Sequence, residues 1–419
     1  MHRALADRIY YGWVVVGITI LTLLISSGVR SAPGVLIHPL EEDLGWTRTQ
    51  LSFAVSIGLI LTGLAAPFGG ALMDRIGPRR VMLGGLILIV GSLAGGAAMN
   101  ALWHLTLFWG VVSGVGTGVV ATVLGATVAT RWFVARRGMV LGGMSAAASA
   151  GQLIFVPLLM WLVVVIGWRS ATLVLMGCAL ALMLPVLVLM RDSPGDVGLL
   201  PYGATGAIET EVARVDIRAT VRHATRVPEF WLLAGSFFIC GATSNGLVGT
   251  HLIPHAIDHG IPEVTAAGVL AVMGAMNFTG TLASGWLTDR YDPRKLLACY
   301  YTFRGVSLFL VPFVTDIPGL TVFAVLFGLD YIATVPPTVS LTADIFGKRH
   351  VGLLFGWIFC AHQLGAASAA YLGGVARDTL GDYNVAFLSA GALAVAGGLM
   401  ALRIDRRPLA EAAPAPGTA

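Results

Sequence analysis

Long apolar segments alternate along the chain with short polar ones. A helix needs about 20 apolar residues to cross a hydrocarbon core of about 30 Å, and twelve segments reach this length. We predict a membrane-spanning helix at each of residues 11–37, 50–73, 81–99, 104–130, 138–165, 168–190, 229–252, 264–288, 296–314, 318–342, 351–375 and 383–403. The runs are unbroken and do not alternate as barrel strands do, so the pattern predicts an all-α membrane protein with twelve transmembrane helices.

A long polar stretch between the sixth and seventh spans divides the chain. It contains several prolines and glycines with mixed charges, which is typical of a linker. We expect a six-helix bundle at residues 1–190, a cytoplasmic linker at 191–228, a second six-helix bundle at 229–404 and a disordered tail at 405–419. The halves also repeat, because the pair Asp74-Arg75 that ends the second span returns about 215 residues later as Asp289-Arg290. Two six-helix repeats are typical of secondary transporters.

The cations are distributed unevenly across the expected membrane. Of the 26 lysine and arginine residues, 21 fall in segments on one side. Arg48, Arg169 and Arg377 fall on the opposite side, while Arg30 and Arg304 fall inside spans. Loops rich in Lys and Arg stay in the cytoplasm, so we expect both termini there. Arginine outnumbers lysine by 24 to 2, which is typical of a GC-rich bacterial genome, and we expect the inner membrane of a bacterium.

The composition excludes several classes of protein. Charged residues make up 11% of the chain, less than half of the about 25% that soluble domains carry, so a soluble enzyme is excluded. The net charge of +4 does not indicate nucleic-acid binding, because the cations follow the membrane topology. The four cysteines lie in apolar runs without CxxC spacing, and the sequence has no nucleotide-binding or catalytic motif. We expect no disulfide, no metal, no cofactor and no enzymatic activity.

The segment between spans two and three reads Gly70-Ala-Leu-Met-Asp74-Arg75-Ile-Gly77-Pro-Arg79-Arg80. It resembles the loop two-three signature of the major facilitator superfamily, and this resemblance, which covers nearly the whole chain, implies alternating access between two halves. An Asp at a helix end with arginines beside it can join the cytoplasmic faces of the halves through charge pairs. We expect a conformational latch formed by Gly70, Asp74, Arg75, Gly77, Arg79 and Arg80. The second copy, at Asp289 and Arg290, has Asp292 where Gly77 would correspond, and we expect a weaker latch there.

Two further stretches resemble the monocarboxylate transporter branch, which includes bacterial organic-anion transporters. One is Tyr11-Gly12-Trp13-Val-Val-Val-Gly17, followed by Arg30, and the other is Arg131-Trp132-Phe133-Val-Ala-Arg136-Arg137-Gly138-Met-Val-Leu-Gly142. The resemblance implies a small organic anion as substrate, moved with a proton or by exchange. One position departs from the branch, because Thr281 stands where anion-handling members usually have an arginine after a pattern like Asn277-Phe-Thr-Gly280.

Arg30 is the leading candidate for contact with a substrate carboxylate. A charged side chain inside a span costs about 3 kcal/mol and indicates function. Arg30 lies about 28 Å from Tyr11 by the helical rise, toward the outer end of the first span. The glycines and Pro33 around it predict a break or kink in the helix. The alternative is an interfacial arginine whose side chain extends to the outer surface.

Three more ionisable residues fall inside spans. The helical rise places Arg304 in span nine and Asp330 in span ten close enough in depth to pair. A structural ion pair and a role in proton coupling both remain open for them. His362 falls near the middle of span eleven, where a histidine could carry a proton or hydrogen-bond a carboxylate, or could be packed as part of the core.

Neutral polar residues complete the candidate site. Gln152, Asn245, Asn277 and Tyr331 fall at mid-depth on spans that line the cavity in this superfamily, and hydrogen bonding between helices is the alternative to ligand contact. At the outer end of span seven, His251, His255, Asp258 and His259 form a cluster that we interpret as a solvated loop or a proton-sensing gate rather than a metal site.

The sequence therefore predicts a secondary active transporter for a mono- or dicarboxylate. Its partners would be the organic anion, the lipid bilayer and, if transport is coupled to protons, a proton. We expect a monomer. An exporter of neutral or cationic drugs or metabolites with the same fold is the alternative, and the missing arginine at Thr281 favours it. A signalling protein with a transporter-like fold is a third possibility.

Overall fold

The computed structural model describes residues 10–120, 122–204, 217–347 and 350–405. Eleven helices in this part of the chain are long and apolar enough to cross a membrane. The helix α8 (Arg137–Leu189) turns at Gly167, whose φ of 79° and ψ of 158° are not helical, between the predicted fifth and sixth spans. This turn brings the count to the predicted twelve, and the described residues contain no strand of a sheet beyond one isolated bridge. The predicted all-α membrane fold is confirmed.

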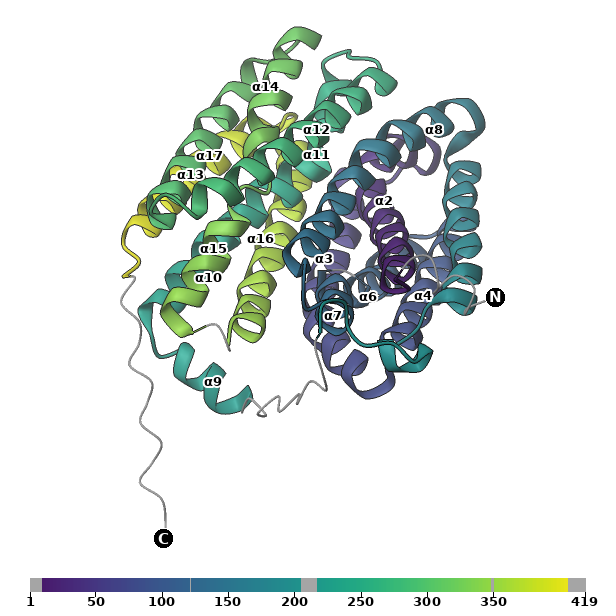
Figure 1. Ribbon diagram of the computed structural model, residues 1–419. Coiled ribbons are helices and arrows are strands. Elements are labelled where there is room, and N and C mark those ends of the chain that lie inside the picture. Colours follow the sequence, from purple (N-terminus) through teal and green to yellow (C-terminus); the bar gives the residue numbers. More distant parts are fainter. Residues whose placement is uncertain (1–9, 121, 205–216, 348–349, 406–419) are drawn as a thin grey trace.

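The first six spans lie on one side of the molecule in Figure 1. They are α2 (Gly12–Leu44), α3 (Arg48–Ile76), α4 (Pro78–Ala97), a fourth span made of α5 (Leu102–Leu105), η1 (Thr106–Val112), α6 (Ser113–Val119) and α7 (Thr122–Trp132), and the two parts of α8.

The last six spans form the other side of the molecule. They are α10 (Pro228–Gly241) with η3 (Ala242–Val248) and α11 (Gly249–Asp258), then α12 (Glu263–Thr288), α13 (Pro293–Leu310) with η4 (Val311–Phe313), α14 (Ile317–Asp330) with α15 (Val335–Phe346), α16 (Val351–Leu380) and α17 (Asn384–Leu402). Between the two groups, η2 (Pro194–Val197) and α9 (Ile217–Ala224) are the described helices of the connection.

Residues suited to helix ends set several of these boundaries. Gly45, at a φ of 66°, ends α2 in the left-handed conformation that glycine adopts without strain. Thr47 then begins α3 with a capping box, in which its hydroxyl accepts from the Gln50 backbone and the Gln50 side chain accepts from the Thr47 backbone. Gly77, at a φ of 87°, makes the turn from α3 into α4, which begins with Pro78.

The first span differs from its prediction. It continues to Leu44 and is helical throughout, although it contains Pro33 and Pro39, so the predicted break beside Arg30 is wrong. The glycines in this stretch provide close packing instead. A Cβ atom on Gly28 would lie 2.6 Å from the Phe155 ring, and one on Gly34 would lie 2.7 Å from the Gly249 carbonyl oxygen. The neighbouring helices therefore approach the α2 backbone directly.

Two spans of the second group are interrupted near their middle. In the seventh span, η3 is a π-helical segment of 7 residues. In the tenth span, α14 ends at Asp330, and a turn over residues 331–334 precedes α15. Interruptions of this kind free backbone groups and are frequent at functional sites.

The two groups of helices meet on the membrane side that carries the α2–α3 and α11–α12 connections, which we call the far side. There a Cβ atom on Gly374 of α16 would lie 2.7 Å from the Arg48 carbonyl oxygen of α3. Deeper along the same helix pair, the Ser56 hydroxyl donates to the Ala367 carbonyl at 2.7 Å. Contact continues to Gly63, where a Cβ atom would lie 2.7 Å from Gln363. The groups are therefore packed together from the far side to about mid-depth.

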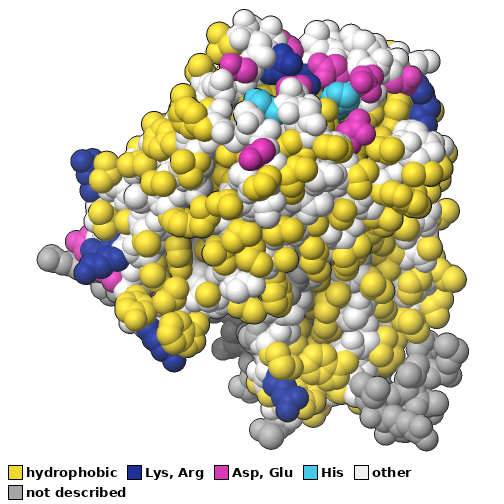
Figure 2. All heavy atoms as spheres, turned by 90° about the horizontal axis from the view of Figure 1, so that it is seen from above, with side chains coloured by type: hydrophobic (Ala, Val, Ile, Leu, Met, Phe, Trp, Pro, Cys, Tyr) yellow, Lys and Arg dark blue, Asp and Glu magenta, His cyan; other side chains and the backbone are white. Residues whose placement is uncertain are grey.

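The surface is divided as a membrane protein requires. Figure 2 shows a broad hydrophobic band between one edge, where acidic, basic and histidine side chains gather, and the opposite edge, where the charged side chains are mainly Lys and Arg. Exposed large residues such as Trp161, Leu184, Trp286 and Leu372 contribute to the apolar surface of the spans. Lipid tails can cover this band, while the two edges contact the headgroups and water.

Candidate functional site

Arg30 lies near the middle of the first span. Because α2 extends to Leu44, Arg30 is about 27 Å from the first residue of the helix and about 21 Å from the last, deeper than predicted. Its side chain is exposed, whereas the neighbouring Val29 and Ala32 are buried. Among the described residues, no hydrogen bond or ion pair engages this guanidinium, and the group with which it interacts electrostatically is Tyr331 of the opposite helix group.

Four of the six candidate substrate residues meet at the phenol of Tyr331, which is itself one of the four. It donates a hydrogen bond to Asn245 Oδ1 at 2.9 Å, and it also interacts with the Gln152 amide and with Arg30. Arg30 and Gln152 come from α2 and α8, whereas Asn245 and Tyr331 come from the two interrupted spans. The structure therefore brings one cation and three neutral hydrogen-bonding groups together where the two helix groups face each other.

The other two candidates have hydrogen-bond partners of their own. Asn277 is buried in α12, where its side-chain oxygen accepts a hydrogen bond from the Thr281 hydroxyl at 3.2 Å. The position that lacks the usual arginine is thus occupied by a hydroxyl that contacts Asn277. His362 is buried in α16, where its ring stacks on Phe359 and its Nδ1 lies 3.0 Å from Gln363 Oε1.

Arg304 and Asp330 face each other inside the second helix group. Arg304 Nε lies 2.6 Å from Asp330 Oδ2, and the two side chains are 0% and 2% exposed. The second carboxylate oxygen, Oδ1, is buried and has no hydrogen-bond partner among the described residues. Arg304 also contacts the Cys240 thiol, and Cys240 in turn interacts with His362. The three ionisable residues predicted inside the later spans therefore form one chain of contacts, adjacent to Tyr331.

A second ionic cluster closes the far side. Arg48 is 2% exposed, and its two terminal nitrogens donate to both oxygens of Asp258 at 2.6 and 2.7 Å. It also donates to Glu41 at 2.9 Å and to the Tyr383 hydroxyl at 2.9 Å, and Arg377 donates to Asp258 at 2.8 Å. Burial raises the pKa of Tyr383, so this phenol remains protonated. We call these five residues the far-side cluster.

The sequence did not reveal the far-side cluster, because its members follow no local spacing: Arg48 and Tyr383, which contact each other, are 335 residues apart. The available signal was the scarcity of cations on that side, where Arg48 and Arg377 are two of three. The cluster also accounts for Asp258 of the predicted histidine group. Within the part of the chain that the structure describes, no group of three His, Cys, Asp or Glu side chains is placed to hold a metal ion.

The described contacts of the latch signature are with the first helix group and with the first residues of the connection. The Arg79 backbone N–H donates to Asp192 at 2.8 Å, and Arg131 donates to the Met73 carbonyl at 3.1 Å. In the second copy, the Arg290 guanidinium lies 4.1 Å from the centre of the Trp286 ring on its own helix. The Asp74 side chain lies outside the described residues.

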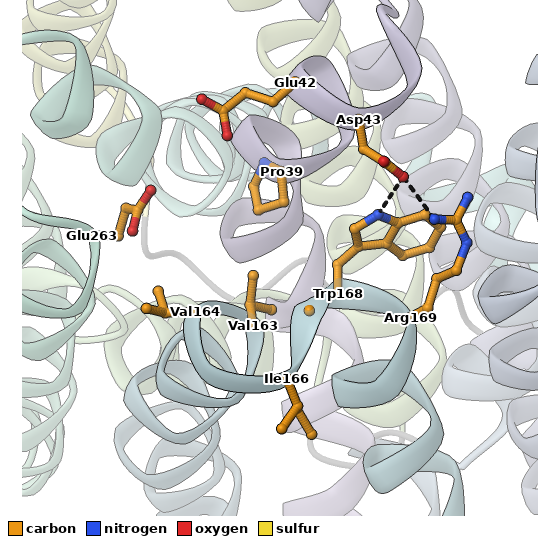
Figure 3. Close-up of a pocket in the computed structure, with 10 residues that line it drawn as sticks. Pro39, Glu42, Asp43, Val163, Val164, Ile166, Trp168, Arg169 and Glu263 are labelled. Atoms are coloured by element: carbon orange, nitrogen blue, oxygen red, sulfur yellow. Dashed lines mark hydrogen bonds and ion pairs between the residues drawn. The ribbon is translucent and has the colours of Figure 1, made fainter.

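A surface pocket of about 680 Å³ lies near the end of α2 (Figure 3). It is lined by Glu42, Asp43 and Glu263 together with apolar residues of the α8 turn. Asp43 accepts hydrogen bonds from Trp168 at 2.9 Å and Arg169 at 2.7 Å, and Glu42 lies 3.5 Å from His38 Nδ1. Glu42 and Glu263 add two more carboxylates to the lining. An acidic pocket does not suit an anionic substrate, and none of the candidate residues lines it.

Twelve spans in two groups, with polar residues of interrupted helices between them, define a secondary transporter. The family model of the Major Facilitator Superfamily matches residues 19–292 and 278–418 of the chain. The protein therefore belongs to the major facilitator superfamily and is a transporter rather than an enzyme, as the loop two-three signature predicted.

Its relatives include named monocarboxylate transporters. The chain is 28% identical to monocarboxylate transporter 13 of Rattus norvegicus over 95% of this chain and 90% of the relative. It is 28% identical to monocarboxylate transporter 11 of Homo sapiens over 94% and 83%. An uncharacterized MFS-type transporter of Bacillus subtilis, YcxA, is 27% identical over 88% and 90%. The predicted resemblance to the monocarboxylate transporter branch is confirmed.

Proposed function

We propose that this protein moves a small organic anion, a mono- or dicarboxylate, across the inner membrane of a bacterium by alternating access. Both termini would lie in the cytoplasm, and the protein would work as a monomer. The relatives named as monocarboxylate transporters support an organic-anion substrate.

The proposal rests mainly on the charge of the central cluster, by which we mean Arg30 and its three neutral neighbours. Arg30 has free donors, and Gln152, Asn245 and Tyr331 beside it are neutral. The other arginine in the membrane interior, Arg304, is compensated by Asp330. The described interior therefore presents one uncompensated positive charge, which would attract an anion and disfavour a cation.

The packing of the two helix groups supports alternating access. Because the groups are in contact from the far side to mid-depth, water would reach Arg30 from the side of the termini. In the opposite state the far-side cluster would separate, and the predicted latches on the cytoplasmic side would engage. The moving units would be the bundles at residues 1–190 and 229–404, joined by the linker at 191–228.

Asp330 is our candidate for the proton site. Its free Oδ1 could accept a proton without breaking the hydrogen bond from Arg304 to Oδ2. His362, which reaches the pair through Cys240, is the second candidate. If neither residue takes up a proton, transport would proceed by exchange of one anion for another.

Ligand-dependent thermal stabilisation of the purified protein tests the substrate class. The panel is pyruvate, benzoate, succinate, glucose, putrescine and tetraphenylphosphonium, each at two pH values. A ligand that binds the native state raises its apparent stability by mass action. We expect stabilisation by carboxylates alone, lost in Arg30→Gln and retained in Arg169→Gln, which removes an exposed arginine outside the site.

Proteoliposome flux of the stabilising carboxylate then tests movement across the membrane. Stabilisation by putrescine or tetraphenylphosphonium alone, or an unchanged carboxylate response in Arg30→Gln, would refute the anion site. The exporter of neutral or cationic compounds would then replace it. Binding without flux would favour a signalling role.

A further inference from the structure

We propose that Arg304 is a positioning residue of the substrate site, which holds the two interrupted spans so that Asn245 and Tyr331 face Arg30. This inference rests on the proposed function, because it assigns Arg304 a role in the same site. Arg304 would not touch the substrate itself, since it is 0% exposed.

Every donor group of Arg304 has an acceptor. Nε donates to the Asp330 carboxylate, and Nη2 donates to the backbone carbonyls of Asp330 at 2.7 Å and Tyr331 at 3.2 Å. Nη1 contacts the Cys240 thiol at 3.1 Å, the Thr243 hydroxyl at 3.2 Å and, at 3.4 Å, the Cys240 carbonyl. One guanidinium therefore joins the end of α14 to the junction of α10 and η3.

These two places are where the seventh and tenth spans lose regular helical hydrogen bonding. At the end of α14 the Asp330 carbonyl accepts from the Ala333 N–H at 3.2 Å, a turn hydrogen bond, and Arg304 supplies a second donor to the same carbonyl at 2.7 Å. Carbonyls at a helix end need such donors in the membrane interior. The positive charge of Arg304 lies at the negative end of the α14 dipole. Arg304 thus supplies donors to the backbone at this interruption, next to Tyr331, whose φ of −49° and ψ of −48° remain helical.

The interruptions carry the two neutral residues of the site. Asn245 belongs to η3, and Tyr331 follows α14 directly, so each lies within a few residues of an Arg304 contact. The 2.9 Å hydrogen bond between their side chains closes this arrangement. A movement of either backbone would break that bond and withdraw the phenol from Arg30.

The five donors of a planar guanidinium are required for this role. A lysine carries one compact ammonium with three donors and cannot reach both backbones at once. Arg304→Lys keeps the charge opposite Asp330 and removes most of the bridge. It therefore separates the positioning role from simple charge pairing.

Hydrogen exchange detected by mass spectrometry tests the bridge without any substrate. We expect Arg304→Lys to speed exchange in peptides covering residues 242–250 and 328–336, and to leave α3 unchanged. Cys240→Ala, which removes one contact of the bridge, should produce a smaller change in the same peptides. Cys360→Ala is the control, because it removes the other buried cysteine, which lies in α16 and has no contact with Arg304. Unchanged exchange in both segments of Arg304→Lys would overturn the proposal, and if that variant does not fold, unchanged exchange in Cys240→Ala overturns it.

Binding of pyruvate, benzoate and succinate provides the second readout. We expect Arg304→Lys and Tyr331→Phe each to weaken binding about 5- to 10-fold, because each loses the directed phenol. The double variant should then bind about as weakly as Arg304→Lys alone, since the two changes remove the same contact. Arg169→Lys, a change at an exposed arginine outside the site and outside the far-side cluster, should not weaken binding in this way. Additive losses would contradict the positioning role. Absence of carboxylate binding in the wild type would reject the proposed function, and hydrogen exchange would still decide the role of Arg304.

Discussion

The far-side cluster makes a quantitative prediction about the balance between the two access states. Arg48 of the first helix group contacts Asp258 and Tyr383 of the second. In the opposite access state these residues would separate into water. Arg48→Gln therefore removes stabilisation from the state seen here and leaves the opposite state almost unaffected.

The magnitude follows from burial. Removing one partner of a buried ion pair costs about 3–5 kcal/mol. Asp258 retains Arg377 as a partner and its side chain is 18% exposed, so part of this cost is recovered. We expect a net loss of about 2–3 kcal/mol, which changes the equilibrium between the two states about 30- to 150-fold. A minor state at one per cent would become comparable to the present one.

Distances between spin labels on the far side measure this shift. Labels at Glu42 and Thr315 occupy exposed positions of the first and second helix groups, in a background without the four native cysteines. We expect Arg48→Gln to add a population with a longer distance. Arg169→Gln is the matched control, since its partner Asp43 belongs to the same helix group.

An unchanged distance distribution in Arg48→Gln would refute the gating role of the far-side cluster. The gating role would also be refuted if Arg169→Gln shifted the distances equally, because the effect would then come from surface charge in general. Loss of folding in Arg48→Gln would be tested with Tyr383→Phe, which removes one contact of Arg48 and should shift the distances in the same direction.

Three further predictions concern packing and the site. Gly241→Ala would place a Cβ atom against the His362 carbonyl oxygen and should lower stability by about 1–3 kcal/mol in thermal unfolding, whereas Gly356→Ala, which has open space, should not. Tyr331→Phe loses the hydrogen bond to Asn245 and should weaken binding of the stabilising carboxylate about 5- to 10-fold in a titration, and equal affinity would exclude the phenol from the site. Asp330→Asn should abolish uptake driven by a proton gradient and retain counterflow exchange in proteoliposomes, and loss of both would assign Asp330 to the structure alone.

The sequence predicted the elements that depend on local pattern. Unbroken apolar runs predicted the spans, and the helical rise placed Arg304 and Asp330 at matching depths, where the structure has them 2.6 Å apart. The extent of the first span was missed, because glycine and proline near Arg30 favour a break locally while packing against α8 and α11 maintains the helix. The far-side cluster was missed because it depends on how the two groups of helices meet, which no local spacing encodes.

The three buried or central arginines show how partners determine the role of one residue type. Arg48 shares its donors between the two helix groups, so its contacts hold one access state. Arg304 uses all of its donors within the second group, so its contacts should persist in both states. Arg30 has no hydrogen bond among the described residues, and its side chain is exposed at mid-depth. A charge without a partner at this depth is energetically unfavourable, and a bound anionic ligand would offset this cost. A substrate carboxylate would supply the missing acceptor, and its departure would leave Arg30 to be solvated from whichever side is open.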